Sequence, residues 1–188
     1  DAVQHVIDER LYAKFHIPEW IIPHIEAGWN DDVPAIYGRF DFTFKNGIPK
    51  LLEFNADTPT SLFESSVVQW FWLQDLYPGK DQFNSIHEKL IAYWKYLKEY
   101  LHDDTLYFSC IKDNLEDLTT TEYMRDCAIQ AGLDTKFIFM DEIGWDLTSP
   151  VFLDLENNPI SNIFKLYPWE WLLNEDFGKN ITRDRNNS

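Results

Sequence analysis

Residues 37–55 contain the pattern that restricts the fold most. Polar and apolar side chains alternate from Arg39 to Phe44, which is the period of a β-strand. Lys45-Asn46-Gly47 follows, and Asn-Gly is a strong signal of a tight hairpin turn. The run from Lys50 to Asn55 fits a returning strand. This segment therefore predicts a β-hairpin.

The alternation also predicts which side chains of the hairpin share a face. We expect the phenylalanines of the first strand to be buried together with Leu52 and Phe54, because apolar faces pack against a core. A register that pairs Asp41 with Glu53 also pairs Arg39 with Asn55. A shift of one residue would send the carboxylates to different faces.

Two carboxylates directly opposite each other in a sheet repel, so they need a cation or a raised pKa on one of them. The oxygen atoms of Asp41, Glu53 and Asn55 are hard ligands that suit Mg²⁺, an ion that also binds substrate phosphates. Arg39 can hold phosphate oxygens by a bidentate bond. The alternative is a solvated hairpin face with an ordinary Arg–Asp ion pair.

The rest of the chain predicts an α/β fold. A strand at 105–111, a helix at 119–131 and a strand at 136–140 form a βαβ unit with parallel, Rossmann-like strands. Residues 1–178 are expected to form a single α/β unit, and residues 179–188 a loose polar tail. Flanking helices are expected at 2–15, 18–29, 61–74, 84–101 and 169–177, and a final pair of strands at 151–155 and 160–166.

Two segments offer further binding groups. The hydroxyls of Thr58, Thr60 and Ser61 precede a helix, where free backbone N–H groups favour anions such as a substrate carboxylate. The alternative is plain N-capping. Glu116 and Asp117 lie after the first parallel strand, just ahead of the next helix, where they could hold an ammonium group or simply favour the helix dipole.

Charge limits the partners. The chain has 32 acidic and 16 basic residues and a net charge of −16, which disfavours nucleic acid and anionic membrane as main partners. No apolar run approaches the ~20 residues of a membrane span. Cys110 and Cys127 have no CxxC or zinc-site spacing, so we expect reduced thiols in a cytoplasmic protein.

Three segments together resemble the glutathionylspermidine synthase family, especially its synthetase-only members. They are Tyr-Gly-Arg-Phe-Asp-Phe at 37–42, Leu-Leu-Glu-Phe-Asn-Ala-Asp-Thr-Pro-Thr-Ser at 51–61, and Phe-Lys-Leu-Tyr-Pro-Trp-Glu-Trp at 164–171. The resemblance implies an ATP-grasp ligase that uses ATP and Mg²⁺ to activate the glycine carboxylate of glutathione as an acyl phosphate. A spermidine amine then attacks and an amide forms.

The resemblance also implies roles for single residues. Arg39 matches the arginine that stabilises the transferring phosphoryl group of ATP. The other matched positions are Asp41, Glu53 and Asn55 as magnesium ligands, Thr58 and Thr60 near the glutathione, and Glu116 and Asp117 as the pair that holds the polyamine.

The sequence also departs from the family pattern. The acidic pair is Glu-Asp rather than two glutamates, which leaves the amine open. The ATP-binding lysines and the Gly-rich loop of the family lie downstream of this region, and the chain has only 7 glycines. We therefore expect the pre-ATP-grasp part of an incomplete ATP-grasp ligase, inactive in isolation. The alternatives are a non-catalytic polyamine- or peptide-binding module and a regulatory subunit derived from the ligase fold.

Overall fold

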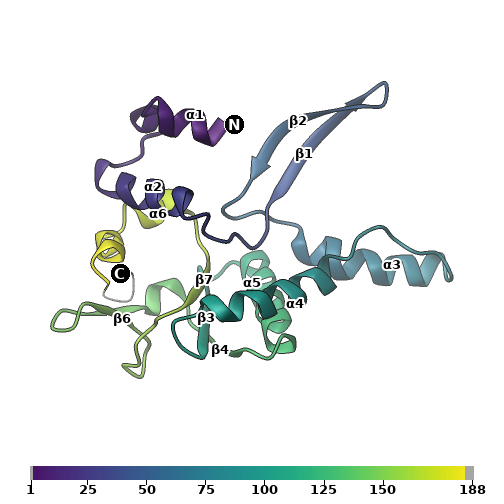
Figure 1. The fold of residues 1–188 in the computed structure, drawn as a ribbon. Coiled ribbons are helices and arrows are strands. Elements are labelled where there is room, and N and C mark those ends of the chain that lie inside the picture. Colours follow the sequence, from purple (N-terminus) through teal and green to yellow (C-terminus); the bar gives the residue numbers. More distant parts are fainter. Residues whose placement is uncertain (1, 185–188) are drawn as a thin grey trace.

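A three-stranded parallel sheet organises the larger part of the molecule (Figure 1). The computed structural model describes residues 2–184. The sheet has the order β4-β3-β7, formed by β3 (Thr105–Cys110), β4 (Asp134–Phe137) and β7 (Ile163–Leu166). Helix α5 (Leu115–Gln130) connects β3 to β4, which run parallel. The predicted βαβ unit and α/β class are confirmed.

The main core lies between this sheet and two helices. Helix α4 (Ile86–Leu97) is amphipathic, with its buried side chains three or four residues apart. The ring of Trp94 meets Phe108 of β3 edge-on, with 5.6 Å between ring centroids. The most deeply buried members of the core cluster are Leu90, Trp94, Leu106, Phe108, Met124, Cys127 and Ala128.

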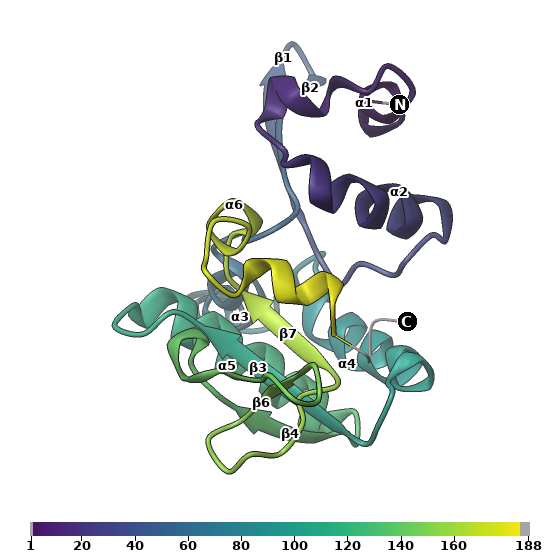
Figure 2. The same ribbon diagram turned by 90° about the vertical axis from the view of Figure 1, so that its left-hand side faces the viewer.

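The N-terminal helices lie beyond the end of the sheet at which β7 ends (Figure 2). The helical segments outside the core are α1 (Ala2–Asp8), η1 (Leu11–Phe15), η2 (Glu19–Ile21), α2 (Ile22–Asn30), η4 (Lys98–Tyr100), η5 (Met140–Glu142), α6 (Trp169–Leu172) and η6 (Gly178–Thr182). The helix expected at 169–177 is therefore short. Part of the expected loose tail forms the 3₁₀ turn η6, and residues 185–188 lie outside the described residues.

The hairpin projects from this body as a two-stranded ribbon (Figure 1). Strand β1 (Arg39–Lys45) pairs antiparallel with β2 (Ile48–Asn55). Asn46 and Gly47 both have positive φ, as a two-residue hairpin turn requires. At the base the predicted register is confirmed, because Arg39 is paired with Asn55 and Asp41 with Glu53.

A bulge changes the register beyond the base of the hairpin. Phe42 pairs with Leu51, so Leu52 is the extra residue. Paired residues share a face, and Leu51 therefore joins the phenylalanine face. The prediction that Leu52 occupies that place is wrong.

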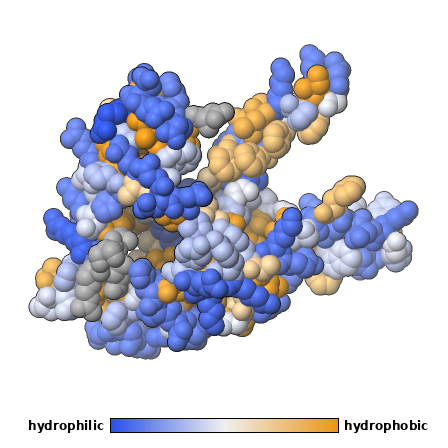
Figure 3. Space-filling view, viewed as in Figure 1, coloured by the Kyte–Doolittle hydropathy of each residue, from blue (hydrophilic) through white to orange (hydrophobic). Residues whose placement is uncertain are grey.

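The prediction that the phenylalanine face is buried is also wrong. Phe40 is 54% exposed and Phe44 is 69% exposed. The reason is the position of the ribbon, since no other element of residues 2–184 packs extensively against it. Apolar residues accordingly cover much of the projecting arm in the space-filling view (Figure 3).

The short strands near the C-terminus pair differently from the expectation. Strand β6 (Val151–Leu153) pairs with β5 (Gly144–Asp146), whereas β7 joins β3. Strands therefore form within both expected segments, 151–155 and 160–166, but the expectation that they pair with each other is wrong, apart from an isolated bridge between Leu153 and Pro159. The helix expected at 61–74 is confirmed as a π-helical turn, η3 (Glu64–Val68), that continues into α3 (Gln69–Leu76).

Among residues 2–184, no helix combines the length and the apolar character that crossing a membrane requires.

Candidate functional site

The base of the hairpin carries a connected polar cluster. Arg39 Nε donates to Asp41 Oδ1 at 2.9 Å, and Arg39 Nη2 donates to Asp41 Oδ2 at 3.3 Å. When the amide of Asn55 is oriented to satisfy both neighbours, its Nδ2 donates to Glu53 Oε1 at 3.0 Å and its Oδ1 accepts from Arg39 Nη2 at 3.1 Å. The structure therefore brings together the four residues that the sequence placed on one face.

Charge in this cluster is arranged to keep the carboxylate of Asp41 ionised. The hydrogen bond from Arg39 is the largest cause that lowers the pKa of Asp41. The same bond raises the pKa of Arg39, with further contributions from the charges of Asp41 and Glu53. The guanidinium thus offsets part of the negative charge of the two opposed carboxylates.

The donor set fits a hard divalent cation. Asp41 and Glu53 supply carboxylate oxygens, and Asn55 supplies an amide oxygen when its amide is turned the other way, with Oδ1 rather than Nδ2 toward Glu53. All three residues are at least partly accessible to solvent. Within residues 2–184, no group of three or more His, Cys, Asp or Glu side chains is placed to hold a metal ion. An ion held by two carboxylates and an amide would keep several ligands from water or phosphate, which is typical of Mg²⁺.

The turn after β2 is tied to this cluster. Arg39 Nη1 donates to Thr60 Oγ1 at 3.1 Å and to Thr60 O at 3.2 Å. The hydroxyl of Tyr37 donates to Pro59 O at 3.1 Å. Thr58 is half-buried in the same turn, and Ser61 adopts a positive φ of 67°.

N-capping by the threonines, the alternative reading of this turn, is not seen. No side chain caps the start of η3, and the Thr60 hydroxyl accepts its hydrogen bond from Arg39. The turn therefore presents the hydroxyl group of Thr60 beside the polar cluster, where an anionic substrate was expected.

The acidic pair lies in the first turn of α5. Asn114 is the N-cap, and its Oδ1 accepts from the backbone N–H groups of Glu116 at 3.1 Å and Asp117 at 3.2 Å. The helix begins at Leu115, four residues before the predicted start at Thr119. The placement of the pair in the preceding loop is therefore wrong. The signal that was missed is Asn114, a residue type favoured at N-caps.

Electrostatic coupling connects this helix start to the turn. Burial, followed by the charge of Glu116, raises the pKa of Asp117. Burial, followed by the charge of Asp117, raises the pKa of Tyr37, the residue whose hydroxyl bonds the turn at Pro59. Tyr37 thus lies between the acidic pair and the turn.

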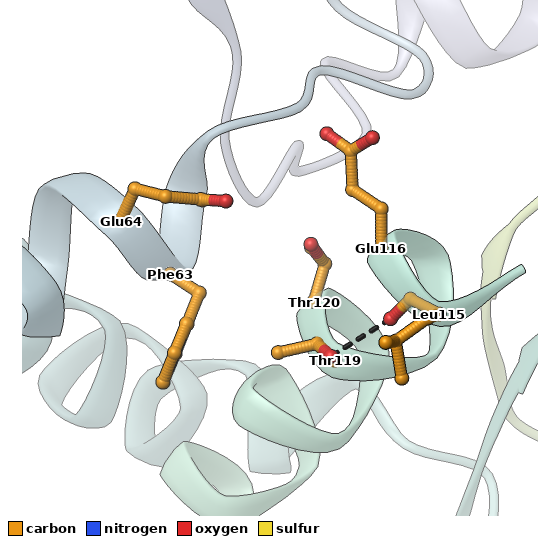
Figure 4. Close-up of a pocket in the computed structure, with 6 residues that line it drawn as sticks. All are labelled: Phe63, Glu64, Leu115, Glu116, Thr119 and Thr120. Atoms are coloured by element: carbon orange, nitrogen blue, oxygen red, sulfur yellow. Dashed lines mark hydrogen bonds between the residues drawn. The ribbon is translucent and has the colours of Figure 1, made fainter.

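A cavity of about 440 Å³ opens between η3 and α5 (Figure 4). Glu64 extends from η3 toward α5, whereas Glu116 projects from the start of α5 at the rim of this space. Sequence reasoning missed Glu64, because nothing in its spacing relates it to Glu116. The lining residues are Phe63, Glu64, Leu115, Glu116, Thr119 and Thr120.

Comparisons with known proteins identify the family of the chain. The sequence model of the family described as "Glutathionylspermidine synthase preATP-grasp" matches residues 1–188. A Haemophilus influenzae protein named "Putative acid--amine ligase" is 39% identical over 174 residues, which cover 91% of this chain and 44% of the relative. The bifunctional glutathionylspermidine synthetase/amidase of Escherichia coli K12 is 26% identical over 168 residues, 87% of this chain and 26% of the relative.

Trypanothione synthetase of Crithidia fasciculata is 28% identical over 192 residues, covering 97% of this chain and 28% of the relative. The chain therefore spans less than half the length of each of these relatives. The match of the family model over the whole sequence is decisive for membership. One of these relatives is named an acid–amine ligase, and the other two are named synthetases. The chain belongs to the glutathionylspermidine synthase family, in its pre-ATP-grasp region.

Proposed function

We propose that this chain forms part of an ATP- and Mg²⁺-dependent ligase that joins the carboxylate of a glutathione-like peptide to a polyamine such as spermidine through an acyl phosphate. The observation that carries the proposal is the cluster of Arg39, Asp41, Glu53 and Asn55 at the base of the hairpin. The relatives' names support the reaction class, since they include an acid–amine ligase and a glutathionylspermidine synthetase.

In this proposal the cluster stabilises charge during phosphoryl transfer. Asp41, Glu53 and Asn55 would hold magnesium, which neutralises phosphate charge when it is bound. Arg39 is held by Asp41 and Thr60, so its guanidinium is already oriented before the substrate arrives. A preoriented donor loses little energy to reorganisation as charge develops on the transferring group.

The carboxylate substrate would lie along the turn of Thr58, Thr60 and Ser61. The hydroxyl group of Thr60 and the guanidinium of Arg39 lie together at the base of the hairpin. Hydroxyl and guanidinium donors suit a carboxylate that must meet a phosphate beside a cation. This places the anionic substrate next to the cluster.

The amine substrate would bind at the acidic residues at the start of α5. Glu116 and Asp117 would attract its ammonium groups, and Glu64 lines the same cavity from η3. Phe63 and Leu115 add apolar surface to the same lining, which suits the methylene segments of a polyamine. A polyamine carries cationic groups separated by such segments, and the lining offers both acidic and apolar side chains.

Replacing Arg39 tests the catalytic part of the proposal. In a family-length protein, Arg39→Ala should lower kcat by about 10²–10³, as loss of one charge-stabilising donor does elsewhere. The assay is ADP release with ATP, glutathione and spermidine. The matched control is Arg10→Ala, which removes an exposed arginine that makes a surface ion pair with Glu26. Equal kcat values for the two variants would remove Arg39 from the mechanism.

A binding module without catalysis is the second candidate, favoured by the acidic cavity between η3 and α5. Calorimetry with spermidine separates the two proposals. Binding to this chain that weakens with salt and ignores Mg²⁺ supports the module. Dependence on Mg²⁺ and ATP in the family-length protein supports the ligase.

A further inference from the structure

One side chain in the turn after β2 reaches across the fold. Asp57 Oδ2 accepts the backbone N–H of Trp169 at 2.7 Å, a residue 112 positions later in the chain. Its other oxygen, Oδ1, lies 3.4 Å from Lys165 Nζ. Asp57 therefore links the hairpin turn to the end of β7 and the start of α6.

Lys165, which pairs with Asp57, is held by further contacts of its own. Lys165 Nζ donates to Tyr167 O at 2.7 Å and lies 4.2 Å from the centroid of the Trp169 ring. The Lys165 side chain is only 15% exposed. Burial lowers the pKa of Lys165, and the charge and hydrogen bond of Asp57 oppose that effect. The ammonium group thus depends on Asp57 for compensation of its charge.

Asp57 lies in the chain between two groups of proposed site residues. It comes two residues after Asn55 and one before Thr58, between the residues proposed to hold magnesium and those proposed to hold the carboxylate. The turn is also held by Arg39 at Thr60 and by Tyr37 at Pro59. The hairpin has no extensive packing on other elements of residues 2–184, so these few bonds fix its base relative to the sheet.

β3 and β7 are parallel neighbours, with Cys110 opposite Leu166, so both strands end at the same edge of the sheet. The segment after β3 leads to the acidic pair of α5, and the segment after β7 leads to Trp169. A bond from the turn to Trp169 therefore fixes the hairpin cluster to the sheet edge that also carries the acidic pair.

We propose that Asp57 is a positioning residue of the ligase, which holds the turn against the end of β7 and so sets the placement of Arg39 and Thr60 relative to the amine side of the site. This inference rests on the proposed function. Asp57 acts through the turn and is not assigned any contact with a substrate.

The test uses the family-length protein with ATP, glutathione and spermidine. Asp57→Ala should lower kcat by about 10-fold to 100-fold, the scale of a small misplacement of reacting groups. Asp57→Asn retains an oxygen for the Trp169 N–H and should recover part of that loss. The matched control is Asp134→Ala, because Asp134 also bonds another strand, through Thr105, but at the opposite end of the parallel strands.

A double-mutant cycle distinguishes positioning from general weakening. Thr60→Val removes the hydroxyl that accepts from Arg39. If Asp57 acts through the turn, Asp57→Ala lowers kcat less in the Thr60→Val background than in the wild type. The inference is overturned if the two substitutions lower kcat by factors that simply multiply, or if Asp57→Ala has the wild-type kcat.

Hydrogen exchange provides a readout that does not need activity. The amide of Trp169 should exchange faster in Asp57→Ala than in the wild type and in Asp134→Ala, because its acceptor is lost. If the wild-type protein shows no ligase activity, the proposed function fails by itself. An unchanged exchange rate at Trp169 overturns the link whether or not the protein is active.

Discussion

At the scale of single residues, Asp154 is the carboxylate whose pKa departs most clearly from its ordinary value. Its side chain is 8% exposed and lies 3.1 Å from Lys136 Nζ. The Tyr107 hydroxyl donates to it at 2.8 Å, and the backbone N–H of Asn158 does so at 2.8 Å. Burial alone would raise the pKa of Asp154, but these hydrogen bonds together lower it well below its usual range.

A lowered pKa in the folded state gives a definite pH dependence. The stabilisation from Asp154 is fully present above the ordinary aspartate pKa of about 4 and is lost as the pH falls from there toward the folded value. Asp154→Asn should lower the free energy of unfolding at neutral pH by about 2 kcal/mol. Urea denaturation at neutral pH and at about pH 3 measures both effects.

The Asp154→Asn variant should also lose less stability on acidification than the wild type does. Asp126→Asn is the control, because its carboxylate is exposed and, among residues 2–184, accepts a hydrogen bond only from Gln130 in the same helix. An identical loss on acidification in wild type and Asp154→Asn would contradict the assignment.

At the scale of elements, the N-cap of α5 decides where the acidic pair stands. Asn114→Ala removes the acceptor of the Glu116 and Asp117 N–H groups and should cost about 1 kcal/mol of stability. Asn114→Ser should restore most of it, since serine is also a favoured cap. Thermal unfolding of the three proteins checks the order. A serine variant no more stable than the alanine variant would show that capping is not the cause.

Several elements could be predicted from local signals. The Asn46-Gly47 turn and the alternation along β1 predicted the pairing of Asp41 with Glu53, because a period of two and a tight turn together leave little freedom of register. The amphipathic spacing of α4 and the strand–helix–strand order of β3, α5 and β4 could also be predicted from the sequence. Such signals lie within a few residues of each other in the chain.

Other features depend on contacts that no short pattern records. The pairing of β7 with β3 joins residues more than fifty positions apart, and the bond from Asp57 to Trp169 spans 112 positions. The bulge at Leu52 could not be predicted, because no glycine marks that part of the strand. Alternation along β1 identifies an apolar face, but it does not show whether anything covers that face. The exposure of Phe40 and Phe44 was therefore not predictable.

At the scale of the whole molecule, apolar exposure and net charge act against each other. The hairpin presents exposed aromatic rings, while a charge of −16 keeps copies of the chain apart. Added salt screens that repulsion, since the Debye length falls from about 10 Å at 0.1 M to about 3 Å at 1 M. Self-association of the chain should therefore increase with salt, as measured by static light scattering.

The hairpin should be the source of this association. Replacing Phe42 and Phe44 by threonine keeps strand propensity and removes ring surface, so scattering in high salt should fall. Replacing Val3 and Phe15 by threonine is the control, because both are exposed but lie in the N-terminal helical region. Equal scattering from the two double variants would place the association elsewhere.

The ribbon of β1 and β2 also behaves geometrically as a lever. Its tip at Asn46 lies roughly 20 Å from Arg39 at the rise of an extended strand, and Arg39 stands at the pivot. In a rigid tilt about the base, the displacement of an atom grows with its distance from Arg39. A tilt of the ribbon about its base would therefore move the aromatic side chains near the tip much more than the guanidinium of Arg39. The outer part of the ribbon could then change its position with little effect on the polar cluster.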